Sequence, residues 1–170
     1  MAAISVEEFK QALRHHPAGV AIITAATPEG PVGITASSVA SVGIAPPALA
    51  FSVTHSGGSA GRILEAGTFV VHLAAAHNLD VLEAFAVSGA ERFTESQGWR
   101  SLETGEPHLP SARVALRCRA VSITPIGPSS LVLAEVLDII GGGEDDESDA
   151  AGAPLVYHDR AFHVLEPARV

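Results

Sequence analysis

Small hydroxyl-bearing residues fill a short segment that could line a site for a flat ligand. From Gly33 to Val42 the sequence reads GITASSVASV, and Pro46-Pro47 follows a few residues later. Few bulky side chains stand in the way, so backbone amides and hydroxyls can reach the polar rim of a flat aromatic ring. A polar turn between two strands has the same composition, and the residues alone leave both interpretations open.

A second segment combines glycine, hydroxyl and basic residues just before a predicted helix. It runs from Thr54 to Arg62 and reads THSGGSAGR. The first turn of a helix carries unpaired N–H groups and partial positive charge, both of which stabilise an anion such as phosphate. The glycines allow a nest of amides, and Arg62 adds a full charge. An ordinary glycine-rich turn is an equally good interpretation of this loop.

The remaining reactive residues give little support to metal or covalent chemistry. The chain has eight histidines, but none pairs with a carboxylate at a spacing typical of zinc sites, so we expect no metal. The single cysteine, Cys118, lies in an alternating strand pattern, which predicts a buried and inert thiol. A site of this kind suits a bound cofactor that carries the reaction itself, and it suits a non-enzymatic binding protein equally well.

Composition and charge narrow the classes of protein. The chain has 170 residues and a net charge of −9, and 47% of its residues are hydrophobic. We expect one domain, residues 1–170, without a nucleic-acid partner because no basic stripe is present. No apolar segment approaches a membrane span and no signal-peptide pattern occurs, so no membrane association and a cytoplasmic location are expected. The acidic, glycine-rich segment from Gly141 to Gly152 predicts an exposed, mobile loop.

Hydrophobic periodicity predicts mostly strands, with three helices between them. The first helix, 5–13, begins with Ser5 and Glu8 at capping-box spacing, and its apolar stripe is expected to face inward. That stripe consists of Val6, Phe9 and Leu13. The other helices are expected over 59–66 and 79–86, the latter capped by Asn78.

The expected strands do not alternate regularly with the helices. They are 19–25, 31–37, 39–42, 48–53, 68–73, 114–123, 131–139, 153–158 and 161–165. The turn-rich stretch 88–110 is expected to cross the surface, and 124–130 to connect two long strands. This pattern favours a mainly β fold with helical insertions, specifically an antiparallel barrel of Greek-key-like topology.

Five segments occur in an order that resembles a known family. They are Pro17–Val20, Gly33–Ser38, Gly67–Leu73, Glu91–Phe93 and Pro154–His158. Together they resemble the flavin reductase-like, FMN-binding split-barrel family, which includes the small reductase components of two-component flavin monooxygenases. The resemblance implies a split β-barrel that binds FMN or FAD and reduces the flavin with NAD(P)H. It also implies a homodimer that supplies reduced flavin to a partner monooxygenase.

The resemblance assigns site residues as well. It implies that the hydroxyl-rich segment lines the isoalloxazine ring and that the glycine-rich loop holds the flavin phosphate. The residues assigned to the ring are Thr35, Ala36, Ser37, Ser38, Val39 and Ser41. The residues assigned to the phosphate are Thr54, Ser56, Gly57 and Ser59. Arg92 and Phe93 are assigned to the flavin tail or to the dimer interface.

One departure from the family pattern concerns the electron donor. Many members carry a Gly-Asp-His motif between the two late strands, where the histidine helps to receive the nicotinamide. Here that stretch reads Gly127-Pro128-Ser129-Ser130, with neither aspartate nor histidine. Tyr157 and His158 on the closing strand are the candidates to contact the nicotinamide instead. Two alternatives stay open: a flavin-binding carrier or sensor without NAD(P)H reductase activity, and a reductase with another donor or a deazaflavin substrate.

Overall fold

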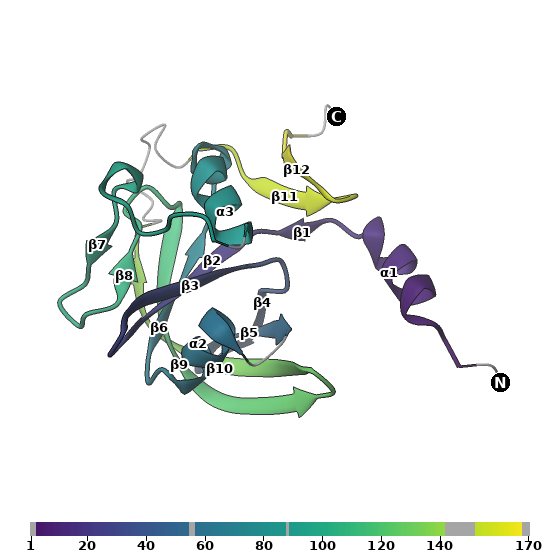
Figure 1. Ribbon diagram of the computed structural model, residues 1–170, viewed down its shortest axis with the longest axis horizontal. Helices are drawn as coiled ribbons and strands as arrows, with labels where there is room; N and C mark the ends of the chain where they lie inside the picture. Colours follow the sequence, from purple (N-terminus) through teal and green to yellow (C-terminus); the bar gives the residue numbers. More distant parts are fainter. Residues whose placement is uncertain (1–2, 55–56, 88, 142–151, 168–170) are drawn as a thin grey trace.

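The computed structural model describes residues 3–54, 57–87, 89–141 and 152–167 (Figure 1). Seven strands form the main sheet in the spatial order β3-β2-β6-β9-β10-β5-β4, and each neighbouring pair is antiparallel. Their bounds are β2 Ala21–Thr27, β3 Gly30–Ala36, β4 Ala40–Ile44, β5 Pro47–Thr54, β6 Phe69–Leu73, β9 Val114–Ile126 and β10 Ser129–Ile140. The expected mainly β, antiparallel fold with helical insertions is confirmed.

The sheet curls until its two edges approach each other. β3 and β4 lie at opposite edges, yet residues 37–39 alone connect them. Seven strands laid flat would separate the edges by about 29 Å, whereas four residue steps span at most about 14 Å. The sheet must therefore bend round, although no ladder joins β3 to β4 or β5 within the described ranges. The expected barrel is thus a curled sheet with an open seam.

Within the described ranges, two small sheets and three α-helices accompany the main sheet. One sheet has the order β1-β11-β12, and β7 pairs with β8 in the other. These elements span β1 Ala18–Gly19, β7 Arg100–Ser101, β8 Pro107–His108, β11 Leu155–His158, β12 Ala161–Val164, α1 Val6–Arg14, α2 Gly58–Glu65 and α3 Leu79–Ala86, with 3-10 turns η1 Ala76–Asn78 and η2 Glu95–Gln97. α2 and α3 both pack against β3, whereas α1 projects from the body (Figure 1).

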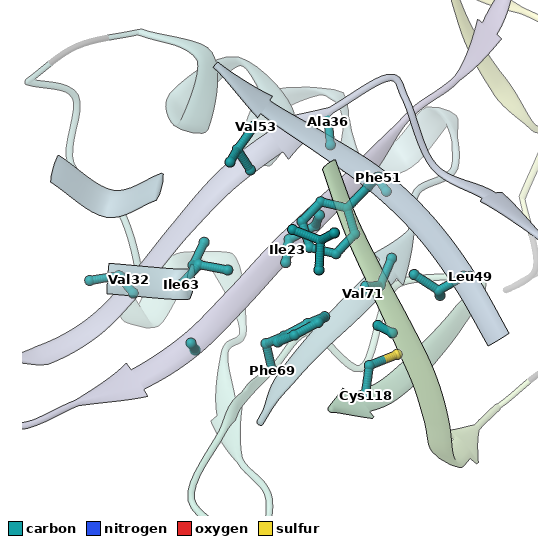
Figure 2. Packing of buried hydrophobic residues seen from close by; sticks show 14 residues of the cluster. Ile23, Val32, Ala36, Leu49, Phe51, Val53, Ile63, Phe69, Val71 and Cys118 are labelled. Carbon is teal, nitrogen blue, oxygen red and sulfur yellow. The ribbon is translucent and has the colours of Figure 1, made fainter. Parts of the chain in front are cut away.

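The main hydrophobic core lies inside the curl of the large sheet (Figure 2). Phe51 of β5 and Phe69 of β6 meet edge to face, with ring centroids 5.5 Å apart. Ile23, Val71 and Cys118 belong to the same fully buried cluster. Burial raises the pKa of the Cys118 thiol to about 12, so the predicted inert strand cysteine is confirmed.

A second core holds a buried histidine. His72 of β6 is 0% exposed, its Nδ1 lies 3.1 Å from the Ile22 carbonyl oxygen, and its Nε2 accepts the Leu109 N–H at 3.1 Å. Burial lowers the pKa of His72 to about 3, which keeps the imidazole neutral. The expectation that 88–110 only crosses the surface is wrong at Leu109 and Glu106, because each is at most 2% exposed. A buried imidazole needs partners, and the backbone of Leu109 supplies one of them.

The first helix forms as predicted but packs differently. The capping box is present, because the Ser5 hydroxyl accepts the Glu8 N–H and the Glu8 carboxylate accepts the Ser5 N–H. The apolar stripe does not face inward: Val6, Phe9 and Leu13 expose 70%, 59% and 51% of their surface. Helical periodicity identifies an apolar face but carries no information about what covers it.

Two smaller expectations are wrong, and a third concerns residues that the structure does not describe. The β9–β10 ladder continues to Ser129 opposite Ile126, so residues 124–126 and 129–130 are strand and the turn is only two residues long. The Asn78 side chain makes no cap bond to α3; it accepts the Ala75 N–H and donates to Ser111. The expected acidic loop lies largely outside the described residues.

None of the helices in the described part of the chain is both long and apolar enough to cross a membrane.

Candidate functional site

The hydroxyl-rich segment ends an edge strand beside two cavities. In the described ranges β3 has only β2 as a ladder partner, so its other side can bond a ligand at Thr35, whereas the Gly33 carbonyl there accepts a bond from Arg92. Thr35, Ala36 and Ser37 line both cavities. The first, between β3 and β5, has a volume of about 320 Å³, and the second, beside β11 and β12, about 300 Å³. Both volumes suit a small-molecule site.

Ser38 fixes this segment against β5. Its Oγ accepts the Ser52 N–H at 2.9 Å and donates to the Ser52 carbonyl at 3.2 Å. These two bonds bridge the open seam just where the chain passes from one sheet edge to the other. Ser52 therefore belongs to the first cavity, together with Ala60 of α2. Sequence reasoning missed both residues, because nothing in the sequence reports that β3 and β5 face each other.

The glycine-rich loop leads into α2 beside the first cavity. Gly57 is the N-cap of α2 and provides no side-chain bond to the first turn, whose N–H groups are therefore open to an anion. Gly58 has a φ of +60°, a conformation that favours glycine. Thr54 lines the first cavity, and Ser59 lies in the first turn of α2. The assigned phosphate residue Ser56 lies outside the described residues.

Arg92 and Phe93 hold the backbone beside a third cavity. Arg92 donates from Nε to the Ala84 carbonyl at 3.2 Å, from Nη2 to Val87 at 3.0 Å and from Nη1 to Gly33 at 3.4 Å. Phe93 has a φ of +58°, and its ring packs against Phe85 with centroids 5.1 Å apart. Arg92, Phe93 and Ser59 line this cavity of about 650 Å³, which adjoins the start of α2.

Ser59 has the sequence surroundings of a hydrolytic nucleophile without the structure of one. The stretch 57–61 reads GGSAG, which matches the Gly-x-Ser-x-Gly spacing of many hydrolases. Neither a histidine nor a carboxylate lines the third cavity within the described ranges. An unassisted serine hydroxyl is a weak nucleophile, so this cavity does not support acyl transfer.

Not every assigned residue reaches a cavity. Val39 packs against the main core, and Ser41 lies on β4 opposite Leu49, away from the cavities described above. Tyr157 lines the second cavity beside Ser37. His158 does not line it; instead its ring lies 6.1 Å from that of His15, and its carbonyl accepts from His163 Nε2 at 3.2 Å. Strand alternation explains the difference, since successive side chains point to opposite faces.

The second cavity contains a cation that the sequence did not single out. Arg160 lies in the tight turn between β11 and β12, where Asp159 and Arg160 have φ values of 50° and 65°. This turn carries the guanidinium toward the cavity that Tyr157 and Phe162 line. A basic residue in a predicted turn is normally an exposed charge, so only the fold reveals its position.

Few titratable groups line the first two cavities. Tyr157 and Arg160 are the only ones among the described lining residues. No group of three or more histidine, cysteine, aspartate or glutamate side chains in the described ranges is arranged to hold a metal ion. The arrangement therefore suits a ligand that brings its own reactivity and needs positioning rather than acid–base catalysis.

Comparison with known proteins places the chain in a family. The family model for the flavin reductase like domain matches residues 13–166. An NADH:FMN oxidoreductase of Rhodococcus qingshengii is 36% identical over 164 residues, covering 96% of this chain and 84% of the relative. The NADH-dependent FMN reductase RutF of Ancylobacter novellus is 33% identical, with 96% and 87% covered. The chain belongs to the flavin reductase-like family.

Solved structures agree with this assignment. A flavin reductase domain protein from Arthrobacter sp. FB24 superposes with a TM-score of 0.85 at 29% identity, covering 96% of this chain and 98% of that one. The flavin reductase HpaC in complex with NADP⁺ gives a TM-score of 0.81 at 25% identity, covering 95% and 98%. Both likenesses extend over nearly the whole chain.

Proposed function

We propose that this protein is an FMN reductase that oxidises NADH. The observation that carries the proposal is the end of β3, where hydroxyls and free backbone groups line two adjoining cavities. Relatives named NADH:FMN oxidoreductase and FMN reductase (NADH), which are 36% and 33% identical over 96% of this chain, support it. The match of one family domain to residues 13–166 supports the further proposal that 1–170 is a single domain.

The residues of the first cavity fit FMN. The pyrimidine edge of the flavin presents both donors and acceptors, and an edge strand offers both kinds of partner. Thr35, Ser37 and Thr54 add hydroxyls on the same cavity wall. The open first turn of α2, led by Gly57, suits the phosphate, and Ser59 can add a hydroxyl bond.

The second cavity fits the nicotinamide of NADH. The same three residues, 35–37, line both cavities, so one short segment holds both ligands in fixed relation. Bound FMN supplies the ring that accepts a hydride. Val20, Ala86 and Phe162 give the second cavity an apolar wall that limits access of water. Tyr157, partly exposed and edge to face with Phe162, presents its ring to the incoming nicotinamide.

The β9–β10 turn favours a second candidate function. Ser129 pairs with Thr54 of the first cavity, so the stretch that lacks the family's aspartate and histidine lies next to the site. If reaction with NADH requires that histidine, this protein binds flavin without reducing it and acts as a carrier or sensor.

We include a homodimer of split-barrel subunits in the proposal. The described strands β9 and β10 carry a series of large apolar side chains that the single chain leaves exposed: Val121, Ile123, Ile126, Leu131, Leu133, Leu137 and Ile139. Exposed apolar surface on this scale marks protein interfaces. The split-barrel description rests on the curled sheet and its open seam. Sedimentation of wild type and Ile126→Glu tests the interface, because a buried charge is expected to produce monomers.

Two further parts of the proposal concern cellular context. Reduced flavin is expected to leave for a partner monooxygenase, as the resemblance to reductase components implies. The proposed use of NADH favours a cytoplasmic location, since NADH is plentiful in that compartment. Measuring oxygenase turnover with and without this protein tests the transfer of reduced flavin.

An absorbance titration tests the function directly. Purified protein is titrated with FMN and then FAD, and NADH or NADPH is added without oxygen. A shifted flavin spectrum that bleaches with NADH supports the reductase, and a shifted spectrum that never bleaches supports the carrier. No spectral change with either flavin contradicts both.

A matched pair of variants locates the flavin. Thr35→Val keeps the side-chain shape and removes one hydroxyl from the cavity wall, so FMN affinity is expected to fall several-fold. Thr27→Val removes a hydroxyl at the far end of the β2–β3 hairpin and should leave FMN affinity unchanged. Equal affinities for Thr35→Val and wild type would place the flavin elsewhere.

A further inference from the structure

A basic groove continues outward from the second cavity. It lies between α1 and the β11–β12 hairpin and has a volume of about 580 Å³. We call it the α1 groove and define it by Phe9, Lys10, Leu13, His16, Tyr157 and Arg160. Ser37, Tyr157 and Arg160 line both this groove and the second cavity, so the two spaces are continuous.

The charge of the α1 groove is opposite to that of the chain. Among the described residues, Lys10, Arg14, His16 and Arg160 line it and no carboxylate does, although the sequence has a net charge of −9. Arg14 is neutralised by an ion pair with Asp159. Within the described ranges, neither Lys10 nor Arg160 takes part in an ion pair. Two cations are therefore available to an anionic ligand.

α1 is fixed to the β11–β12 turn at one end and is capped locally at the other. At its C-terminal end the Asp159 N–H donates to the Arg14 carbonyl at 3.1 Å, and the Arg14 side chain pairs with the Asp159 carboxylate. The hydrogen bond from Arg14 lowers the pKa of Asp159, so the pair persists well below neutral pH. At its N-terminal end the capping box of Ser5 and Glu8 secures the first turn.

Three large side chains that are exposed to solvent form an apolar wall of the groove. Phe9, Leu13 and Tyr157 expose 59%, 51% and 37% of their surface, and all three border the groove. A planar heterocycle can bury against such a wall while phosphates meet the cations. A dinucleotide whose nicotinamide enters the second cavity has its diphosphate and adenine on the side where this groove begins.

We propose that the α1 groove binds the ADP half of NADH, with Lys10 and Arg160 on the diphosphate and Phe9 and Leu13 against the adenine. The proposal deepens the reductase function and rests on it. It also supplies contacts to the donor that do not depend on the absent aspartate and histidine of the β9–β10 turn.

Steady-state kinetics with variants test the groove. Lys10→Gln and Arg160→Gln are each expected to raise the KM for NADH about tenfold, in line with the loss of one charge-assisted bond, while FMN affinity stays the same. Arg100→Gln is the matched control, because it removes an exposed charge from β7, outside the groove. The KM should also rise with ionic strength in wild type and less so in the double variant.

Chemical labelling gives a readout independent of turnover. Lys10 is the only lysine in the sequence, so an amine-acylating reagent modifies it and the N-terminal amine alone. Peptide mass spectrometry should show that ADP slows labelling of Lys10 and that adenosine, which lacks phosphate, does so far less. Labelling of the N-terminal amine is the internal reference.

The outcomes distinguish failure of the proposed reductase function from failure of the proposed ADP site in the α1 groove. If wild type oxidises no NADH, the proposed function fails first. If wild type is active but the two variants keep its KM and ADP leaves Lys10 labelling unchanged, the groove proposal is overturned. Variants that keep the KM but lose dimers would show that a second copy of the chain, and not ADP, occupies the groove.

Discussion

Gly33→Ala is the substitution whose effect follows most directly from the packing. An added Cβ would lie 2.3 Å from Cε1 and 2.9 Å from Cδ1 of Phe85, whereas carbon atoms pack at about 3.5–4.0 Å. Phe85 cannot easily move, because it is 4% exposed and its ring contacts Phe93 and Trp99. Overpacking of this kind costs about 1–3 kcal/mol, and the overlap places Gly33→Ala at the upper end. For a chain of this length the melting temperature should fall by about 6–12 °C.

The assay is urea and thermal unfolding at one fixed protein concentration, which keeps any contribution from dimerisation the same for every variant with wild-type association. Gly67→Ala is the control, because Gly67 is exposed and its added Cβ meets no atom within 4 Å. That variant is expected to be neutral or more stable by about 0.4–1 kcal/mol. Phe85→Leu should relieve part of the cost of Gly33→Ala, with a coupling energy of about 1 kcal/mol or more. Wild-type stability for Gly33→Ala, or additive effects of the two changes, would refute the reasoning.

Three further predictions use the same stability assay or FMN titration. Ser38→Ala removes both bonds to Ser52, so it should lower the free energy of unfolding by about 1–2 kcal/mol and weaken FMN binding. The control Ser41→Ala should change neither stability nor FMN binding. His72 stays neutral in the folded chain but gains a proton when the chain unfolds below about pH 6.5. The free energy of unfolding should therefore fall by about 1.4 kcal/mol for each unit that the pH is lowered between pH 6.5 and 3, and His72→Gln should flatten that profile. Ser5→Ala should destabilise α1 by about 1 kcal/mol but leave global unfolding unchanged, because α1 has no buried residue; a lower global midpoint would contradict this.

Local patterns predicted the strands and helices well. The capping box at Ser5 and the β2–β3 hairpin depend on neighbouring residues, so the sequence contains the whole signal. The β9–β10 connection was misplaced because Pro125 and the serines resemble loop residues, yet the ladder continues through them. The buried part of 88–110 was missed for another reason: Leu109 is fixed by His72, 37 residues away in the chain.

Thr35 to Ser38, Thr54 and Tyr157 were all singled out from the sequence, and each of them lines a cavity. Composition singled out Thr35 to Ser38, because small hydroxyl residues in a row are uncommon in a strand. Ser52 and Arg160 enter the cavities through the curl of the sheet and the turn of a distant hairpin, and neither leaves a pattern in the sequence. Val39 and His158 were assigned to the site by the resemblance, but neither lines a cavity described above: Val39, in the link between β3 and β4, packs against the main core, and strand alternation turns His158 away from the cavity that Tyr157 lines.

Residues 37–39 lie on the surface, yet the length of this link determines how closely the two sheet edges approach. Ser37 and Ser38 are exposed, and exposed links normally accept inserted residues with little loss. Here three residues span the distance between the first and last strands of a seven-stranded sheet. Two extra glycines would preserve every ladder and leave the core composition untouched, yet they would let the seam widen. Insertion at this one surface position should therefore abolish flavin binding in a chain that still folds.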